Sequence, residues 1–100
     1  MQIKKEKENG VTVLHIIGQM TSPTSPLVEA AINNVLDEES RLILDFSKVD
    51  FLASSGIRVL LTTQKKINSF HGSLTLRHVA PVVMDVFEMT GLKDFLRIEP

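Results

Sequence analysis

One hundred residues are enough for one compact domain and too few for two, so we expect a single domain over residues 1–100. A hydrophobic share of 43% can supply a folded core, and a net charge of −1 gives no overall field that would favour nucleic acid or an anionic membrane. The chain has no cysteine, which excludes disulfides and cysteine-based metal or nucleophilic sites. It shows no apolar signal region and no run near the ~20 apolar residues of a membrane span. We therefore expect a cytoplasmic protein without membrane insertion.

The N-terminal residues predict a hairpin. Gln2–Glu8 is weakly apolar, which favours a strand at the edge of a sheet, and Val11–Ile17 is a more apolar strand. Asn9 and Gly10 lie between them and are typical of a type I′ turn, because both central residues of that turn need a positive φ. The two strands are therefore expected to pair in antiparallel fashion.

A first helix is expected after one of two Ser-Pro pairs, at Ser22 or at Ser25, because serine is a good N-cap and proline suits the first helical position. Its core-facing stripe is expected to consist of Val28, Ala31, Ile32, Val35 and Leu36. The acidic residues 37–39 would close this helix with a charge that its dipole disfavours. Arg41–Phe46 is nearly all apolar, which is typical of a strand covered on both faces and predicts a central place in a partly parallel sheet.

The second half of the chain continues the alternation of helix and strand. A helix is expected from about Ser55 to Ser69, a strand over Ser73–Arg77, a third helix from Pro81 to a left-handed cap at Gly91, and a short final strand within residues 95–98. The order β-β-α-β-α-β-α-β predicts an α/β domain with a mixed, mostly parallel sheet of about five strands, covered by three or four helices.

The stretch from Asp45 to Leu61 reads D-F-S-K-V-D-F-L-A-S-S-G-I-R-V-L-L and connects a strand, a loop and a helix. Ser54 and Ser55 stand where this helix begins. A hydroxyl at such a position can cap free backbone N–H groups, and the following Gly56 lets another surface come close. The stretch therefore predicts a serine at a helix N-terminus.

Enzyme chemistry finds no support in the residue patterns. The histidines, His15, His71 and His78, are not in a motif with a second base or ligand, and no metal-ligand cluster is visible in the sequence. The Ser-Ser-Gly run lacks the flanking glycine of a nucleophile elbow, and no P-loop is present. We therefore expect a protein that is not an enzyme and that uses no cofactor or metal.

Two blocks resemble the STAS domain family, and in particular the bacterial anti-sigma factor antagonists. The first is V-D-F-L-A-S-S-G-I-R-V-L-L, and the second runs from Arg77 to Ile98, R-H-V-A-P-V-V-M-D-V-F-E-M-T-G-L-K-D-F-L-R-I. The resemblance implies a STAS-like fold and a protein that binds an anti-sigma factor, which is also a serine kinase, and so frees a sigma factor to regulate transcription. A PP2C-type phosphatase would reset the switch, and the antagonist would act as a monomer or weak dimer.

The resemblance also implies which residues act. Ser54 aligns with the serine that the kinase phosphorylates, and Ser55 is the second choice. The expected partner-binding residues are Thr21, Ser22, Ala53, Ser54, Ser55, Gly56 and Arg58. Ala53 stands where many members of the family carry aspartate. Arg58 lies four residues after Ser54, where helix neighbours meet, so our hypothesis is that it contacts a phosphate on Ser54.

Two alternatives remain open at this level. Ser54 could serve only as a helix cap, which is worth about 1 kcal/mol relative to alanine. The domain could also be an accessory subunit of a transport or other signalling complex that acts by protein contact without phosphorylation, as some STAS-like domains do.

Overall fold

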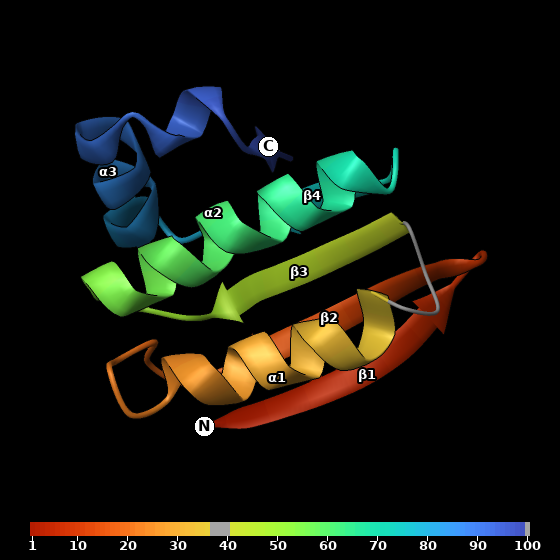
Figure 1. Cartoon of the computed structure of the whole chain (residues 1–100). Coiled ribbons are helices and arrows are strands. Elements are labelled where there is room, and N and C mark those ends of the chain that lie inside the picture. The colour runs from red at the N-terminus through yellow and green to blue at the C-terminus, as the bar shows by residue number, and fades with distance from the viewer. Residues whose placement is uncertain (37–40, 100) are drawn as a thin grey trace.

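The computed structural model describes residues 1–36 and 41–99 (Figure 1). Its elements follow in the order β1 (Gln2–Glu8), β2 (Val11–Ile17), α1 (Ser25–Leu36), β3 (Arg41–Lys48), α2 (Ser54–Ser69), β4 (Ser73–Arg77), α3 (Pro81–Thr90), the 3₁₀ helix η1 (Leu92–Asp94) and β5 (Arg97–Ile98). This is the order that the sequence predicts. The acidic residues 37–39, expected to close the first helix, lie outside the described residues.

The five strands form one sheet in the order β1-β2-β3-β4-β5. Only the first pair is antiparallel, and the other neighbours are parallel. Strand β3 therefore takes the central place predicted from its apolar run, and Leu42, Leu44 and Phe46 are buried. It is two residues longer than expected, since it continues to Lys48.

The turn between β1 and β2 is the one that Asn9 and Gly10 predict. Their φ angles are 52° and 81°, so both central residues are in the left-handed region that a type I′ turn requires. The turn sets the register that pairs Glu8 with Val11 and Lys4 with His15.

Helices α1 and α2 lie side by side over one face of the sheet, while α3 and η1 pack together at the β4–β5 end (Figure 1). The apolar residues of helices and sheet form one buried cluster. From α1 it takes Val28, Ile32, Val35 and Leu36, and the predicted Ala31 packs at its margin. Burying one side chain of this size contributes about 1.5–3 kcal/mol, so the cluster is what holds α1 and α2 against the sheet.

The start of α1 is decided by Thr24 rather than by either serine. Thr24 Oγ1 accepts the Thr21 N–H at 2.8 Å and donates to the Gln19 carbonyl at 2.6 Å, which makes a turn of residues 21–24. The Val28 N–H then bonds the Thr24 carbonyl at 3.3 Å, as the first helical turn requires. Of the two possible starts, the helix therefore uses Ser25.

The C-terminal segment follows the predicted pattern with a shorter final strand. Pro81 occupies the first turn of α3, and Gly91 ends the helix at a φ of 77°. Leu92 is buried against the core and begins η1, which leaves only Arg97 and Ile98 for β5. Across the described residues, none of the helices combines the length and apolar character needed to cross a bilayer.

Candidate functional site

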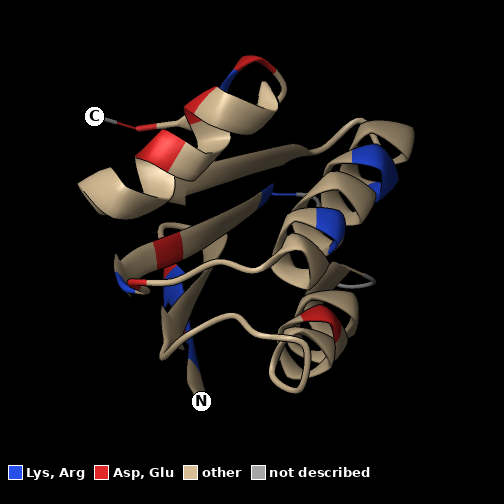
Figure 2. Ribbon diagram, turned by 90° about the vertical axis from the view of Figure 1, so that its left-hand side faces the viewer, with Lys and Arg blue, Asp and Glu red and all other residues tan. Residues whose placement is uncertain are grey.

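The candidate site lies where β2 and β3 end and where α1 and α2 begin, the end of the molecule seen in Figure 2. The two loops at this end are joined by backbone bonds. The Met20 N–H donates to the Phe51 carbonyl at 3.0 Å, and the Ala53 N–H donates to the Met20 carbonyl at 2.8 Å. These bonds hold the beginning of α2 at a fixed place beside the beginning of α1.

Ser54 is the first residue of α2 and is exposed. The residue in the N-cap position is Ala53, and no side chain caps the helix. The expectation that a serine hydroxyl caps this helix is therefore wrong: Ser54 stands one position too late and leaves its hydroxyl free to face solvent. The first N–H groups of a helix have no partner within the helix. The N-terminus of α2 therefore offers free N–H donors together with the positive end of the helix dipole.

Ser55 faces inward. Its hydroxyl lies 3.1 Å from that of Ser25 on α1, and Ser25 is only 1% exposed. This contact links the first turns of the two helices. Of the two serines in the motif, Ser54 is therefore the more exposed one.

Gly56 lets α2 pack closely on the two loops. It is buried, and a Cβ at this position would lie 2.6 Å from Leu52 Cδ1 and 3.2 Å from Met20 Cβ. Among the residues expected to bind a partner, Gly56 thus offers no surface of its own. Its contribution is to let the first turn of α2, which begins with Ser54, pack closely on Met20 and Leu52.

A shallow hollow of about 260 Å³ separates the first turns of α1 and α2, lined by Ser22, Ser25, Pro26, Glu29, Ser55, Arg58 and Val59. Three of the expected residues, Ser22, Ser55 and Arg58, thus meet in one place. Thr21 is half-buried, and its N–H is used by Thr24. Ser54 and Ala53 lie beside this hollow without lining it.

A second group of polar residues surrounds Asp45, which is only 4% exposed. Its Oδ2 accepts from Arg77 Nε and lies 3.0 Å from both that atom and His78 Nδ1, while Oδ1 accepts the Ser47 N–H at 2.9 Å. Burial alone would raise the pKa of this carboxyl, but the hydrogen bonds from Ser47, Arg77 and His78 outweigh burial and hold it well below its usual range.

Arg77 also connects distant strands. Its two terminal nitrogens bond the two carboxylate oxygens of Glu8 at 3.2 Å and 3.1 Å, so that one guanidinium on β4 reaches β1. Hydrogen bonds to Glu8 and to Asp45 raise the pKa of Arg77. The hydrogen bond between Arg77 and Glu8 also lowers the pKa of Glu8. Arg77 therefore holds two carboxylates of different strands at once.

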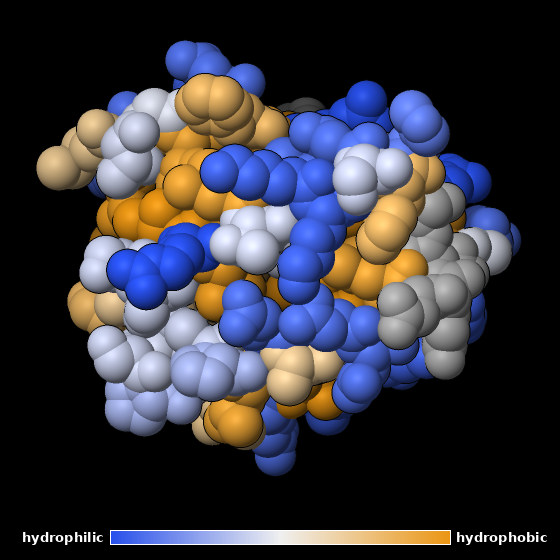
Figure 3. All heavy atoms as spheres, in the orientation of Figure 1, coloured by the Kyte–Doolittle hydropathy of each residue, from blue (hydrophilic) through white to orange (hydrophobic). Residues whose placement is uncertain are grey.

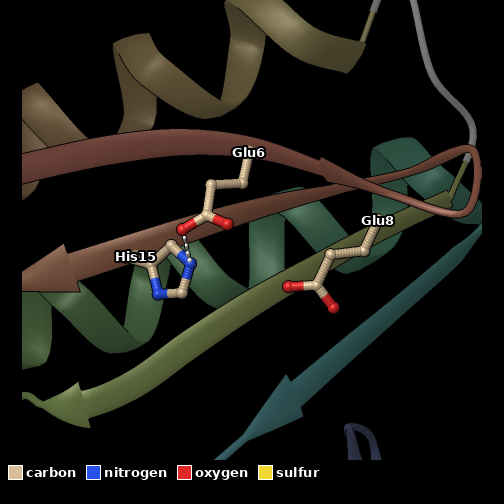
Figure 4. A group of neighbouring side chains, drawn as sticks. All are labelled: Glu6, Glu8 and His15. Carbon is tan, nitrogen blue, oxygen red and sulfur yellow. Dashed lines mark ion pairs between the residues drawn. The ribbon is translucent and has the colours of Figure 1, made fainter.

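Glu6, Glu8 and His15 lie together on β1 and β2 (Figure 4). One ligand atom from each can be chosen so that all lie within 4.8 Å of one another, and His15 Nε2 lies 2.9 Å from Glu6 Oε1. The sequence shows no motif for this group, because strand pairing brings together residues that the sequence separates. Glu8 already holds the guanidinium of Arg77, so the cluster is part of a charge network.

The family model of the STAS domain matches residues 2–100, and the chain belongs to this family. Relatives that match it in sequence include anti-sigma factor antagonists. The anti-sigma-F factor antagonist RsfB of Mycobacterium tuberculosis is 35% identical over 77% of this chain and 70% of its own length. The anti-sigma F factor antagonist of Paenibacillus polymyxa is 28% identical over 92% of this chain and 80% of its own.

Solved structures agree in fold. An anti-sigma factor antagonist from Mycobacterium paratuberculosis has a TM-score of 0.88 at 29% identity, over 99% of this chain and 85% of that one. The Bacillus cell fate determinant SpoIIAA in its phosphorylated form has a TM-score of 0.75 over 99% of this chain and 92% of that one; at 19% identity, this likeness concerns the fold alone. The STAS-like fold predicted from the two sequence blocks is therefore confirmed.

Proposed function

We propose that this protein is an anti-sigma factor antagonist whose docking surface is the beginning of α2 and whose switch is phosphorylation of Ser54. The observation that carries the proposal is the exposed Ser54 hydroxyl at the first position of a helix, in a chain whose relatives carry the antagonist name. When Ser54 is unmodified, this surface binds the anti-sigma factor, and the sigma factor that the anti-sigma factor held is freed. When Ser54 is phosphorylated, the anti-sigma factor dissociates from this surface.

The position suits a phosphate. The group adds about −1.5 to −2 charges at neutral pH, which would repel or displace a docked partner. At the start of a helix it meets free N–H groups and the positive end of the dipole, so the domain can carry it without unfolding. Ala53 brings no side-chain oxygen that would compete for these donors.

Arg58 is proposed as the residue that steadies the phosphate. It is exposed one helical turn after Ser54, and among the described residues its side chain makes no ion pair or hydrogen bond that would have to break first. A guanidinium can form two parallel charge-assisted hydrogen bonds with a phosphate. Arg58→Ala should therefore raise the phosphoserine pKa and lower the stability of the phosphorylated form alone.

The proposed partners are an anti-sigma factor that is itself a serine kinase and a PP2C-type phosphatase that removes the phosphate, and we place this exchange in the cytoplasm. The competing function, an accessory subunit acting by contact alone, would not need a modifiable hydroxyl. The names of the relatives that match in sequence favour the antagonist.

The test is to incubate the purified protein with ATP and a GHKL-type serine kinase from the same genome, and to locate the added phosphate by mass spectrometry. Phosphate is expected on Ser54. Ser55→Ala should still be modified, because its hydroxyl faces Ser25 and is not the acceptor. Ser54→Ala should lose the modification.

Binding to the same kinase provides the second readout. Ser54→Ala should bind as the unmodified protein does, and Ser54→Asp should bind more weakly. Equal binding by both variants, together with no phosphate on Ser54, would reject the switch and favour the accessory-subunit function.

A further inference from the structure

The outer side of α2 carries an apolar groove away from the Ser54 end. It has a volume of about 460 Å³ and is lined by Leu61, Gln64, Lys65 and Asn68 of α2 and by Phe95 after η1. Phe95 is 70% exposed, although aromatic residues usually bury much of their surface. Figure 3 shows apolar surface open between α2 and α3, beside hydrophilic surface over α2. The groove therefore offers a seat for an apolar side chain.

The charged residues that line this groove and the hollow beside it are basic. An adjoining hollow of about 210 Å³ shares three of its residues and adds Arg97, and Lys65 lies on the groove itself. The charged residues of α2 are Arg58, Lys65 and Lys66, all of one sign. The groove should therefore bind an apolar side chain that has carboxylates beside it. Carboxylates are attracted to the basic residues at the groove, whereas other basic groups are repelled.

Helix α3 presents such an anchor on its outer face. Val82 is 54% exposed and Met89 is 86% exposed, and with Asp85 they fall at the spacing of one helix face. Glu88 stands beside Met89, and its exposed contact with Lys93 at 3.4 Å is of a kind worth little. In Figure 2 the charged segments of α3 are acidic and those of α2 are basic.

We propose that the groove is filled by a second copy of this chain. Met89 of one copy enters between Leu61 and Phe95 of the other, and the carboxylates beside Met89 face Lys65 and Arg97. Methionine suits this role because its flexible thioether adapts to irregular apolar seats. Since each copy carries both the anchor and the groove, a reciprocal exchange closes the assembly as a two-fold dimer.

We expect a small interface centred on this one groove, and therefore a weak dimer whose population rises with protein concentration. Sedimentation velocity over about 1 μM to about 1 mM, the range in which weak complexes dissociate, should show a shift from monomer to dimer. Met89→Lys should remain monomeric over this range. Leu27→Lys is the matched control, because Leu27 is an exposed apolar residue at 54% on α1, away from the groove, and it should dimerise as the wild type does.

A charge exchange tests the orientation. A variant with Lys65→Glu and Arg97→Glu, and a second variant with Asp85→Lys and Glu88→Lys, should each be monomeric. An equimolar mixture should form a heterodimer, because the opposite charges then meet again. A wild type that stays monomeric throughout, or a mixture that does not associate, would overturn the proposal. Neither result bears on Ser54, so the failure of this inference is distinguishable from that of the proposed function.

Discussion

Gly56 is where the candidate site has least room for a side chain. A Cβ would lie 2.6 Å from Leu52 Cδ1 and 3.2 Å from Met20 Cβ. Gly56→Val is therefore expected to lower the free energy of unfolding by about 2 kcal/mol through overpacking, measured by urea denaturation. Ser54→Ala changes an exposed residue two positions away and should stay within about 0.5 kcal/mol. Equal stability of the two variants would contradict the packing argument.

Asp45 makes stability depend on pH. The pKa of its carboxyl is held well below its usual range in the folded protein, whereas in the unfolded chain it is about 3.9. A group with a lowered folded pKa contributes stability that is complete above the unfolded pKa and is lost as the pH falls toward the folded one. The free energy of unfolding should therefore decline as the pH falls below about 4, measured by denaturant titration at each pH.

The matched variant for this dependence is Asp45→Asn. It leaves Arg77 and His78 without their shared carboxylate, and breaking a buried ion pair costs about 3–5 kcal/mol. Because Arg77 keeps Glu8, the loss at neutral pH is expected at the lower end of that range, and the decline below pH 4 should be smaller. Asp50→Asn is an exposed control that should leave both properties unchanged. An unchanged pH profile in Asp45→Asn would contradict this account.

At the scale of elements, the beginning of α2 can be stabilised by giving it an N-cap side chain. Ala53 occupies its N-cap and gives no side-chain oxygen. Ala53→Asp should stabilise the unmodified domain by about 1 kcal/mol, read from its thermal midpoint, because a carboxylate there can accept a free N–H. Ala30→Asp, an exposed position inside α1, should bring no such gain. If both variants behave alike, the first turn of α2 is already satisfied in another way.

The elements themselves could be read from the sequence where local chemistry decides them. Asn9 and Gly10 determine a turn, Gly91 ends a helix and the apolar run of β3 places it in the middle, each for a reason contained in a few residues. The start of α1 could not be read, because two Ser-Pro pairs offer equal caps. The choice depends on Thr24, whose hydroxyl binds the Gln19 carbonyl.

The polar group around Asp45 could not be predicted from the sequence. Its members come from strands far apart in the chain: Glu8 from β1, His15 from β2, Asp45 from β3 and Arg77 from β4. Only the sheet order and register place His15 opposite Asp45, and Asp45 opposite Arg77. At the candidate site, by contrast, the motif named Ser54 and Ser55, and the direction of each hydroxyl needed the packing of α1 on α2.

At the scale of the whole molecule, a charge on Ser54 should change the surface and not the body. Ser54→Asp is expected to keep the thermal midpoint close to that of the wild type, with amide NMR shifts confined to the beginning of α2 and the loops beside it. Ser25→Asp is the matched control, because Ser25 is 1% exposed in the same neighbourhood and an unpaired buried charge costs several kcal/mol. A Ser54→Asp variant that unfolds as readily as Ser25→Asp would contradict a surface switch.

The contact between Arg77 and Glu8 joins residues that stand 69 positions apart. The turn of the N-terminal hairpin is local, but the guanidinium that binds Glu8 belongs to β4, which is synthesised much later. A nascent chain halted before Ser73 would therefore lack the guanidinium that Glu8 binds in the complete domain. The bond between the first and fourth strands can therefore form only late in synthesis, after Arg77 has been added.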